Sequence, residues 1–387
     1  MNIICRALTF FQLVWAREYK FTPEKMDKKS LCVTGPDIDS ISDNINGCKN
    51  LEKLVIKDTS ITSMPSSIGQ LEKLKELAIT NNPNLKSLPD ELFSCFRLKL
   101  LNLSNNKLTS LPDKTEMFLQ LQDLNLSGNQ LEKLNLRVEN LKNLLYLNLS
   151  YNQFKQVPAA IGKCLKLRIL DLSGNQLETF DAEVGELTDL YSLLLHNNKF
   201  KEFPTKITKL KNLGHLYLSE NYLEKICPEI KRLEQLRQFF LSDNQFEEFP
   251  VELTSLKDLT VLNLSKNQLK TLPAEIGNFQ NLNELHLSYN KIETLPEEIG
   301  SLHKLGCLYA NYNKLKSLPE GMEKLSELLV LDLSSNELKD LPFKMRELSS
   351  SNMTLYLSEN KIAESGIEGE TLGKKELEEH FEDLIYF

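Results

Sequence analysis

The chain has 387 residues, of which 46 are Lys or Arg and 54 are Asp or Glu, so its net charge is −8. Charges of both signs are interspersed and form no basic face, which argues against nucleic acid as a partner and gives no sign of lipid recognition. No apolar run approaches the roughly 20 residues that a membrane-spanning helix needs, so membrane insertion is not expected.

The first segment of the chain has a helical pattern. Four of its apolar residues follow one another at steps of four, three and four: Ile4, Leu8, Phe11 and Trp15. This spacing predicts an amphipathic helix, and Thr22-Pro23-Glu24 has the pattern of a cap and first turn of a short second helix. We interpret residues 1–27 as an N-terminal helical cap. A helix that binds a partner or a membrane surface is the alternative, whereas a secretion signal is not expected because no basic region precedes the apolar stretch.

A 23-residue unit, L-x-x-L-x-L-x-x-N-x-L-x-x-L-P-x-x-I-x-x-L, recurs from Leu51 to Ile362. One degenerate unit, with Pro36 in the asparagine place, precedes fourteen regular ones, so the repeat array is expected to cover residues 28–362. A period of this size with this spelling is typical of a leucine-rich repeat solenoid. Because each unit buries its leucines only against its neighbours, we expect one elongated domain.

Each unit predicts its own local structure. Leu170 and Leu172 are two residues apart, so on a strand both side chains point into the core. Asn175 follows in a turn, where it must bond backbone groups, since an unpaired buried amide costs about 1–3 kcal/mol. The proline of the unit then forbids continuation of the strand. We therefore predict an α/β fold, a curved solenoid with a parallel β-sheet on its concave face, short helical or irregular segments on its convex face, and helical caps.

The last residues form a different segment. Residues 363–373 hold three glycines and several acids, which indicates a connector. Over 374–387 the apolar residues fall at helical spacing: Leu377, Phe381, Leu384 and Ile385. We expect a capping helix there, with a docking tail as the alternative.

No catalytic, cofactor-binding or metal-binding set emerges. Residues 369–375 resemble a phosphate-binding loop, but the glycine spacing is one residue short and Lys375 stands where Ser or Thr should be. His196, His215 and His286 share the predicted concave face. His196 and His215 belong to adjacent units but are four places apart along the strand direction, too far for both to bind one zinc ion. They are better explained as partner contacts or solvated residues.

The seven cysteines are scattered along the chain. Cys48, Cys95 and Cys164 take the last apolar position of their units and are predicted to be small core residues. No clustered cysteines flank the array, and free buried thiols favour a reducing compartment, so we expect the protein in the cytoplasm.

The residue between the two core leucines of each unit should face solvent. It is Leu194, Tyr217 and Phe240 on three neighbouring strands, which would make a contiguous apolar patch and indicates binding. The alternative is that aromatic residues merely suit strands. With flanking positions, the predicted partner-binding residues are Leu194, His196, His215, Tyr217, Tyr222, Phe240, Val261, His286, Tyr289, Tyr309 and Tyr312.

The units, as in Leu282 to Leu302, resemble those of intracellular leucine-rich repeat proteins of the Ras-suppressor type, and plant Ras-group and bacterial leucine-rich repeat proteins share the pattern. The resemblance covers roughly residues 28–362 and lies in structural positions, so it bears on the fold more than on the partner. Members of that group scaffold small-GTPase and kinase signalling, which is what the resemblance implies for a protein partner here.

The leading hypothesis is a non-catalytic cytoplasmic adaptor that binds a protein on its concave face. Two alternatives stay open. One is the substrate-recognition part of a divergent enzyme, with Cys32, Cys227 or Cys307 as nucleophile. The other is an exported effector that acts on host signalling.

Overall fold

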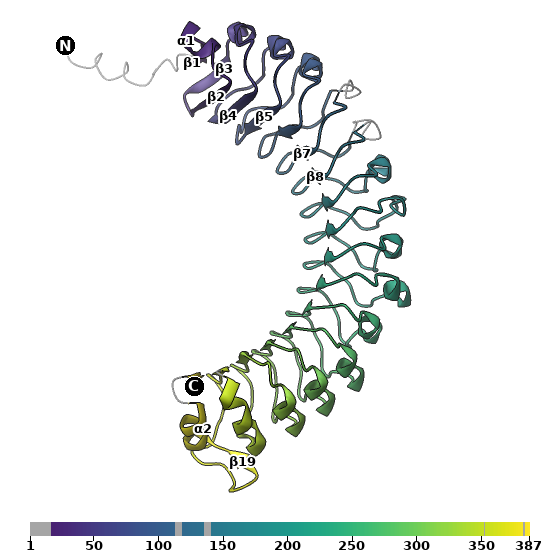
Figure 1. The fold of residues 1–387 in the computed structure, drawn as a ribbon, viewed down its shortest axis with the longest axis vertical. Coiled ribbons are helices and arrows are strands. Elements are labelled where there is room, and N and C mark those ends of the chain that lie inside the picture. The colour runs from purple at the N-terminus through teal and green to yellow at the C-terminus, as the bar shows by residue number, and fades with distance from the viewer. Residues whose placement is uncertain (1–16, 113–117, 135–140, 352, 382–383) are drawn as a thin grey trace, which may run out of the picture. The chain divides into compact units, whose positions relative to one another are not determined.

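The computed structural model describes residues 17–112, 118–134, 141–351, 353–381 and 384–387. The chain forms two compact units, Met1–Leu147 and Asn148–Phe387, and their boundary falls within strand β8 (Tyr146–Asn148). In each unit the strands line one side of a stack of coils and short 3-10 helices line the other (Figure 1). No helix in these ranges is long and apolar enough to cross a bilayer.

The first unit opens with an element that the sequence did not predict. Strand β1 (Arg17–Tyr19) pairs in parallel with β3 (Ile38–Ile41). Helix α1 (Pro23–Met26) begins after Thr22, as its proline indicates, but spans four residues only. The expected helix through Ile4, Leu8, Phe11 and Trp15 lies outside the described residues.

The repeats of the first unit build a parallel sheet. Its strands follow in chain order: β2 (Ser30–Gly35), β4 (Lys53–Thr59), β5 (Glu76–Thr80), β6 (Leu100–Asn102) and β7 (Asp123–Asn125). On the other side of the coils lie η1 (Asp43–Gly47), η2 (Ser66–Gln70) and η3 (Asp90–Ser94). Leu54 pairs with Leu77, and Leu77 with Leu101, so equivalent leucines stack on one another.

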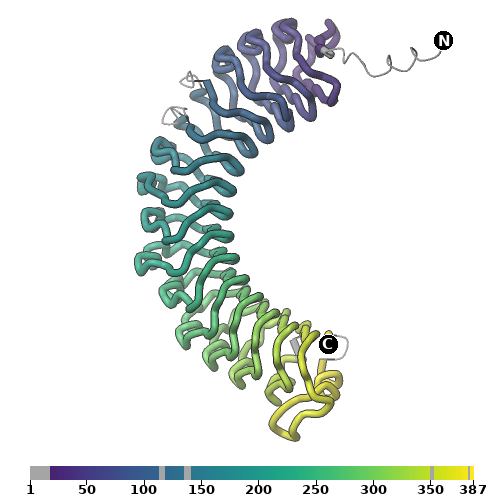
Figure 2. Tube along the Cα trace, turned by 180° about the vertical axis from the view of Figure 1, so that it is seen from behind, coloured from purple at the N-terminus to yellow at the C-terminus, as the bar shows by residue number. Residues whose placement is uncertain are grey.

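The second unit continues the same pattern, with each coil lying against the one before it (Figure 2). Its parallel strands follow in chain order: β9 (Ile169–Asp171), β10 (Ser192–Leu194), β11 (His215–Tyr217), β12 (Gln238–Phe240), β13 (Val261–Asn263), β14 (Glu284–His286), β15 (Cys307–Tyr309), β16 (Val330–Asp332), β18 (Thr354–Tyr356) and β20 (Ile385–Tyr386). From β9 to β16 the register advances by one 23-residue repeat per strand, as Leu193 opposite Leu216 shows.

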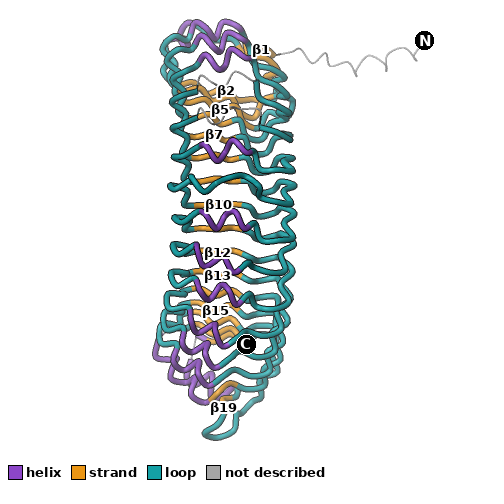
Figure 3. Tube along the Cα trace, turned by 90° about the vertical axis from the view of Figure 1, so that its right-hand side faces the viewer, coloured by secondary structure: helices purple, strands orange, loops and turns teal. Residues whose placement is uncertain are grey.

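In the second unit a proline stands just before each 3-10 helix or is its first residue. These helices lie on the side of the coils away from the strands (Figure 3). In the second unit these are η6 (Ala159–Lys163), η7 (Thr205–Lys209), η8 (Pro228–Arg232), η9 (Val251–Ser255), η10 (Ala274–Asn278), η11 (Glu297–Ser301), η12 (Glu320–Lys324) and η13 (Phe343–Ser351). Pro296, for example, precedes η11 and keeps an extended backbone. Its fixed φ lets the chain leave the strand direction and turn back.

The buried asparagines hold the turns together as expected. Asn221 Nδ2 donates to the carbonyl oxygens of Leu195 and Leu218, both at 3.1 Å, and its Oδ1 accepts from the Phe200 amide at 3.1 Å. One amide therefore ties two neighbouring coils. Among the described residues, no buried side-chain polar atom lacks a hydrogen-bond partner, so the polar row costs the core little desolvation energy.

The C-terminal segment differs from the helix expected over 374–387. Strand β19 (Thr371–Leu372) pairs antiparallel with β17 (Leu341–Pro342), and α2 (Lys374–Phe381) ends before β20. Leu377 and Phe381 are buried as the stripe predicts. Ile385 instead joins the sheet, where Tyr386 stacks on Tyr356 with ring centroids 4.9 Å apart. Branched and aromatic side chains favour this strand over further helix.

The expected connector, residues 363–373, is tied to α2. The Glu376 carboxylate accepts hydrogen bonds from the backbone N–H groups of Gly366 at 3.2 Å and Gly373 at 2.9 Å. The bond from Gly366 is the largest of the effects that lower the pKa of Glu376.

Candidate functional site

The solvent side of strands β9 to β16, here called the strand face, carries most of the predicted residues. Side chains alternate along each strand, so Phe239 is fully buried whereas Phe240 is partly exposed. Leu194 lies opposite Tyr217, which lies opposite Phe240. The Tyr217 and Phe240 rings stack with centroids 4.6 Å apart and planes 3° apart. Leu194, Tyr217 and Phe240 form the apolar cluster.

A residue that the sequence reasoning missed extends this cluster. Tyr191, which is 44% exposed, lies just before β10, and its ring contacts that of His215 at a centroid distance of 4.7 Å. Its hydroxyl lies 3.3 Å from His215 Nε2. The signal was available, since Tyr191 is 24 residues before His215 and therefore one coil away. The sequence reasoning took flanking positions at the strand start and in the turn beside the asparagine, but not the position just before the strand.

The surroundings of His215 and Tyr217 disfavour the charged forms of both side chains. Burial, and then the charge of Arg237, lowers the pKa of His215. Burial, and then the nearby Tyr191, raises the pKa of Tyr217. Both shifts follow from the cost of removing a charged form from water. A neutral, partly dehydrated surface of this kind suits an apolar contact.

A second group lies on β14 and β15, beyond Asn263 of β13. His286 stacks on Tyr309 with centroids 4.7 Å apart, and its Nε2 is 3.2 Å from a Glu284 carboxylate oxygen. Tyr289 and Tyr312 stack at 4.2 Å in the turns that follow these strands. Since Phe240 pairs with Asn263, which pairs with His286, the structure divides the predicted residues into two groups.

The remaining predicted residues lie at the margins of these groups. Val261 begins β13 and pairs with Gln238 on one side and Glu284 on the other. His196 is partly exposed beyond the end of β10, and Tyr222, 45% exposed, follows the buried Asn221. They flank the stacked pairs and belong to none of them.

The backbone at Tyr289 and Tyr312 was not visible in the sequence. Both residues adopt left-handed conformations, with φ of 56° and 54°. This conformation costs an L-residue about 1–2 kcal/mol, and Gly174 takes the equivalent place in another coil with φ of 61°. The same place is left-handed in other coils as well, as at Asp243 and Lys266, so this conformation belongs to the turn of the repeat.

The described residues contain no group of three or more His, Cys, Asp or Glu arranged to hold a metal ion. Cys48, Cys95 and Cys164 are buried as predicted, and burial raises the pKa of Cys95 to about 12. Burial also raises the pKa of Cys227. A nucleophilic cysteine needs the opposite shift, because the thiolate is the reactive form.

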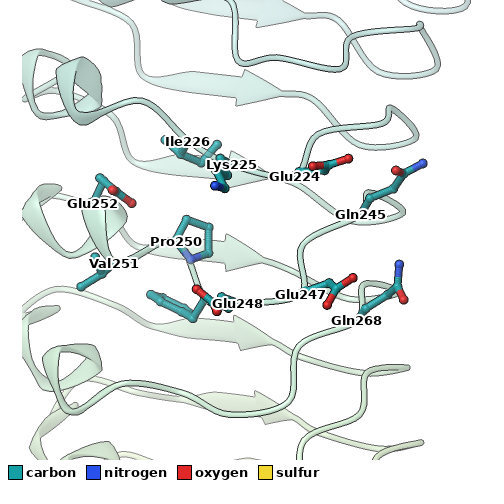
Figure 4. A pocket seen from close by; sticks show the side chains of 11 residues that line it. Glu224, Lys225, Ile226, Gln245, Glu247, Glu248, Pro250, Val251, Glu252 and Gln268 are labelled. Atoms are coloured by element: carbon teal, nitrogen blue, oxygen red, sulfur yellow. The ribbon is translucent and has the colours of Figure 1, made fainter.

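A groove of about 560 Å³ opens on the flank of the second unit, away from the strand face (Figure 4). Four carboxylates line it: Glu224, Glu247, Glu248 and Glu252. Lys225 is the basic residue of its lining, and Glu247 is paired with Lys270 at 3.2 Å. Its chemistry suits a cationic group rather than an anion. The sequence did not predict it, because a groove depends on how loops of successive coils pack.

Two family models match the chain. The model for a leucine-rich repeat region matches residues 155–269 and 259–350, and the leucine rich repeat model matches residues 72–131 and 120–177. No curated protein matches the chain.

Solved structures with the same architecture come from bacteria and from a plant. A leucine-rich repeat protein of Leptospira interrogans is 36% identical with a TM-score of 0.86, covering 94% of this chain and 91% of that protein. A plant peptide hormone receptor, RGFR1 in complex with RGF2, is 25% identical with a TM-score of 0.60, covering 86% of this chain and 61% of that one. An internalin of Listeria monocytogenes, 23% identical with a TM-score of 0.62 and 89% of each chain covered, shows the fold alone.

Proposed function

Because this chain belongs to the leucine-rich repeat family, we propose that it is a non-catalytic scaffold that binds a protein partner on the strand face of its second unit. The observation that supports this best is the apolar cluster on β10 to β12. Leu194, Tyr217 and Phe240 occupy adjacent strands at positions that face solvent. A contiguous exposed apolar patch is typical of binding surfaces, and rigid aromatic side chains supply much of the energy there.

The chemistry around the cluster suggests what the partner offers. Exposed Arg168 and Arg237 lie on the side where the strands begin, whereas Glu220 and Asp243 lie in the turns where they end. Asp243 is paired with Lys266 at 3.1 Å. A partner segment with a central apolar side chain and an acidic residue toward the arginines would match this arrangement. Such rim charges set orientation more than affinity.

The aromatic group of β14 and β15 would extend the same surface. His286 and Tyr309 present stacked rings beside Tyr289 and Tyr312, which are each 48% exposed. Partial exposure leaves area that a partner can cover, and tyrosine hydroxyls can satisfy the polar groups of a peptide backbone.

The compartment and the pathway are part of the proposal. The described cysteines are free, and three of them are buried, which suits a reducing cytoplasm. Through the resemblance to Ras-suppressor-type repeats, we place the partner in small-GTPase or kinase signalling. The plant peptide hormone receptor with the same architecture is itself in complex with RGF2.

The test is affinity capture with the full chain as bait, followed by quantitative mass spectrometry. The Tyr217→Ala/Phe240→Ala double variant removes most of the apolar cluster and should lose the partner. The matched control is Phe96→Ala/Leu119→Ala, because these residues are exposed, at 43% and 58%, and lie in the first unit. The control should retain the partner. Identical sets of captured proteins from the wild type and the cluster variant would contradict the assignment of the surface.

A further inference from the structure

Tyr289 and Tyr312 occupy the same place in two successive coils of the second unit. Their ring centroids are 4.2 Å apart and their planes differ by 9°, the shortest centroid distance among the described aromatic pairs. Each residue is 48% exposed, so a small reagent in solution can reach it. This geometry brings the ring carbons beside the two hydroxyl groups within reach of each other.

The backbone fixes this pair. Both residues have the left-handed conformation, so the two side chains leave the chain in the same direction. The Tyr289 N–H donates to the Asn311 carbonyl oxygen at 3.0 Å, and the Asn290 N–H donates to the Tyr312 carbonyl oxygen at 3.2 Å. Because the two turns are bonded to each other, the rings are held in contact by the register of the coils as well as by their own attraction.

We propose that Tyr289 and Tyr312 are an oxidative modification site, at which a one-electron oxidant couples the two rings into a dityrosine that joins neighbouring coils. The oxidant is hydrogen peroxide acting through a haem peroxidase. Each phenol gives up one electron and its hydroxyl proton, which leaves two phenoxyl radicals. One carbon–carbon bond then forms between positions ortho to the hydroxyls, and the two hydrogens displaced from those carbons return to the phenolic oxygens. The peroxide takes up two electrons and two protons and leaves as two waters.

Other aromatic contacts of the described chain are poorer candidates. Tyr217 stacks on Phe240, Tyr309 on His286, and Tyr191 contacts His215, so each pair holds one phenol only. The other tyrosine stack, Tyr356 with Tyr386, is wider, at 4.9 Å and 14°. The site therefore depends on a pair of phenols in contact, which the repeat supplies at Tyr289 and Tyr312.

The modification changes the strand face beside His286 and Tyr309. Two separate, exposed phenols become one rigid biaryl, and two turns that were joined by hydrogen bonds gain a covalent link. This inference is independent of the proposed partner, because it requires the two tyrosines and an oxidant alone.

The experiment treats dilute full-length protein with a haem peroxidase and one equivalent of peroxide, and isolates the monomer by size exclusion. The expected monomer is lighter by two hydrogen atoms, shows dityrosine fluorescence, and yields on digestion a cross-linked peptide pair that contains Tyr289 and Tyr312. Tyr289→Phe and Tyr312→Phe should each abolish that peptide pair. Tyr222→Phe is the matched control, because Tyr222 is 45% exposed but belongs to none of the stacked pairs, and it should leave the cross-link intact.

Two further variants make a negative result decisive. Cys307 lies two residues before Tyr309 on β15, and the hydrogen bond between their side chains contributes to the raised pKa of Tyr309. Since a thiol can reduce a nearby tyrosyl radical, the reaction is repeated in Cys307→Ser. Tyr386→Phe removes the wider tyrosine pair. If the protein with both substitutions still yields no cross-link between Tyr289 and Tyr312, the proposal is overturned. It is also overturned if adding Tyr289→Phe to that protein leaves its dityrosine fluorescence unchanged.

Discussion

Phe239 and Phe240 are neighbours in the chain, yet β12 places Phe239 wholly in the core and leaves Phe240 stacked on Tyr217 at the surface. The strand period of two separates them. The pair therefore tests the assignment of the strand face without any knowledge of the partner.

We expect Phe239→Ala to lower the free energy of unfolding by about 3–5 kcal/mol, the usual cost of emptying a buried phenylalanine site. Phe240→Ala should change it by less than about 1 kcal/mol, because that side chain keeps contact with water. Urea denaturation followed by circular dichroism measures both. Equal losses in the two variants would mean that Phe240 is a core residue and that the apolar cluster is misassigned.

The asparagine row should make a large contribution to stability. Asn221→Ala leaves the Phe200 N–H without its acceptor. It also removes one of two side-chain donors from the carbonyl oxygens of Leu195 and Leu218, which keep those of Asn198 and Asn244. We expect a loss of about 1–3 kcal/mol, the usual cost of an unsatisfied buried polar group. Gln245→Ala, an exposed change in a neighbouring coil, is the control and should have little effect. A thermal denaturation midpoint unchanged by Asn221→Ala would contradict this role.

The glycine in the I-G step of the repeat permits close packing of coils opposite the strands. A Cβ added at Gly300 would lie 2.0 Å from the Gly321 carbonyl oxygen, whereas at Gly277 the nearest atom, the Glu298 carbonyl oxygen, would be 3.1 Å away. We expect Gly300→Ala to cost about 1–3 kcal/mol through forced separation of two coils. Gly277→Ala is the matched variant and should cost clearly less. Urea denaturation midpoints of the two variants measure these losses. A larger loss in Gly277→Ala than in Gly300→Ala would contradict the prediction.

Acidification should weaken the fold through His215. Burial, and then Arg237, lowers its pKa in the folded protein below the ordinary histidine value, so the unfolded chain binds its proton more readily. Stability from this group is full above about pH 6.5 and falls as the pH drops from there through the lower folded-state pKa. His215→Gln should flatten this part of the curve of melting temperature against pH, while His303→Gln, at an exposed residue, should not. A curve unchanged by His215→Gln would show that this proton is not linked to folding.

The repeat array was predictable from the sequence because its signals are local. A strand period of two sends Leu193 inward and Leu194 outward in any coil of this kind. A buried turn needs an amide such as that of Asn221, and a proline such as Pro296 redirects the chain. The outward position of Leu194, Tyr217 and Phe240 followed from the same rule, although what binds there remains a proposal.

Near its ends the chain departed from its local pattern. Ile385 fits a helical stripe with Leu377 and Phe381, yet it pairs with Leu355 in β18. The spacing of apolar residues indicates which side chains are buried. Whether a helix or a strand buries them depends on the free edge of the last coil, with which a strand can pair.

The sequence by itself determined the coil, its core leucines, its asparagine row and the side of each strand that meets solvent. Tertiary structure alone decided that Tyr191 contacts His215 and that Tyr289 and Tyr312 stack from left-handed backbone. The physical reason is that alternation along a strand is set by the covalent chain, whereas contact between residues one repeat apart depends on the path of every intervening turn.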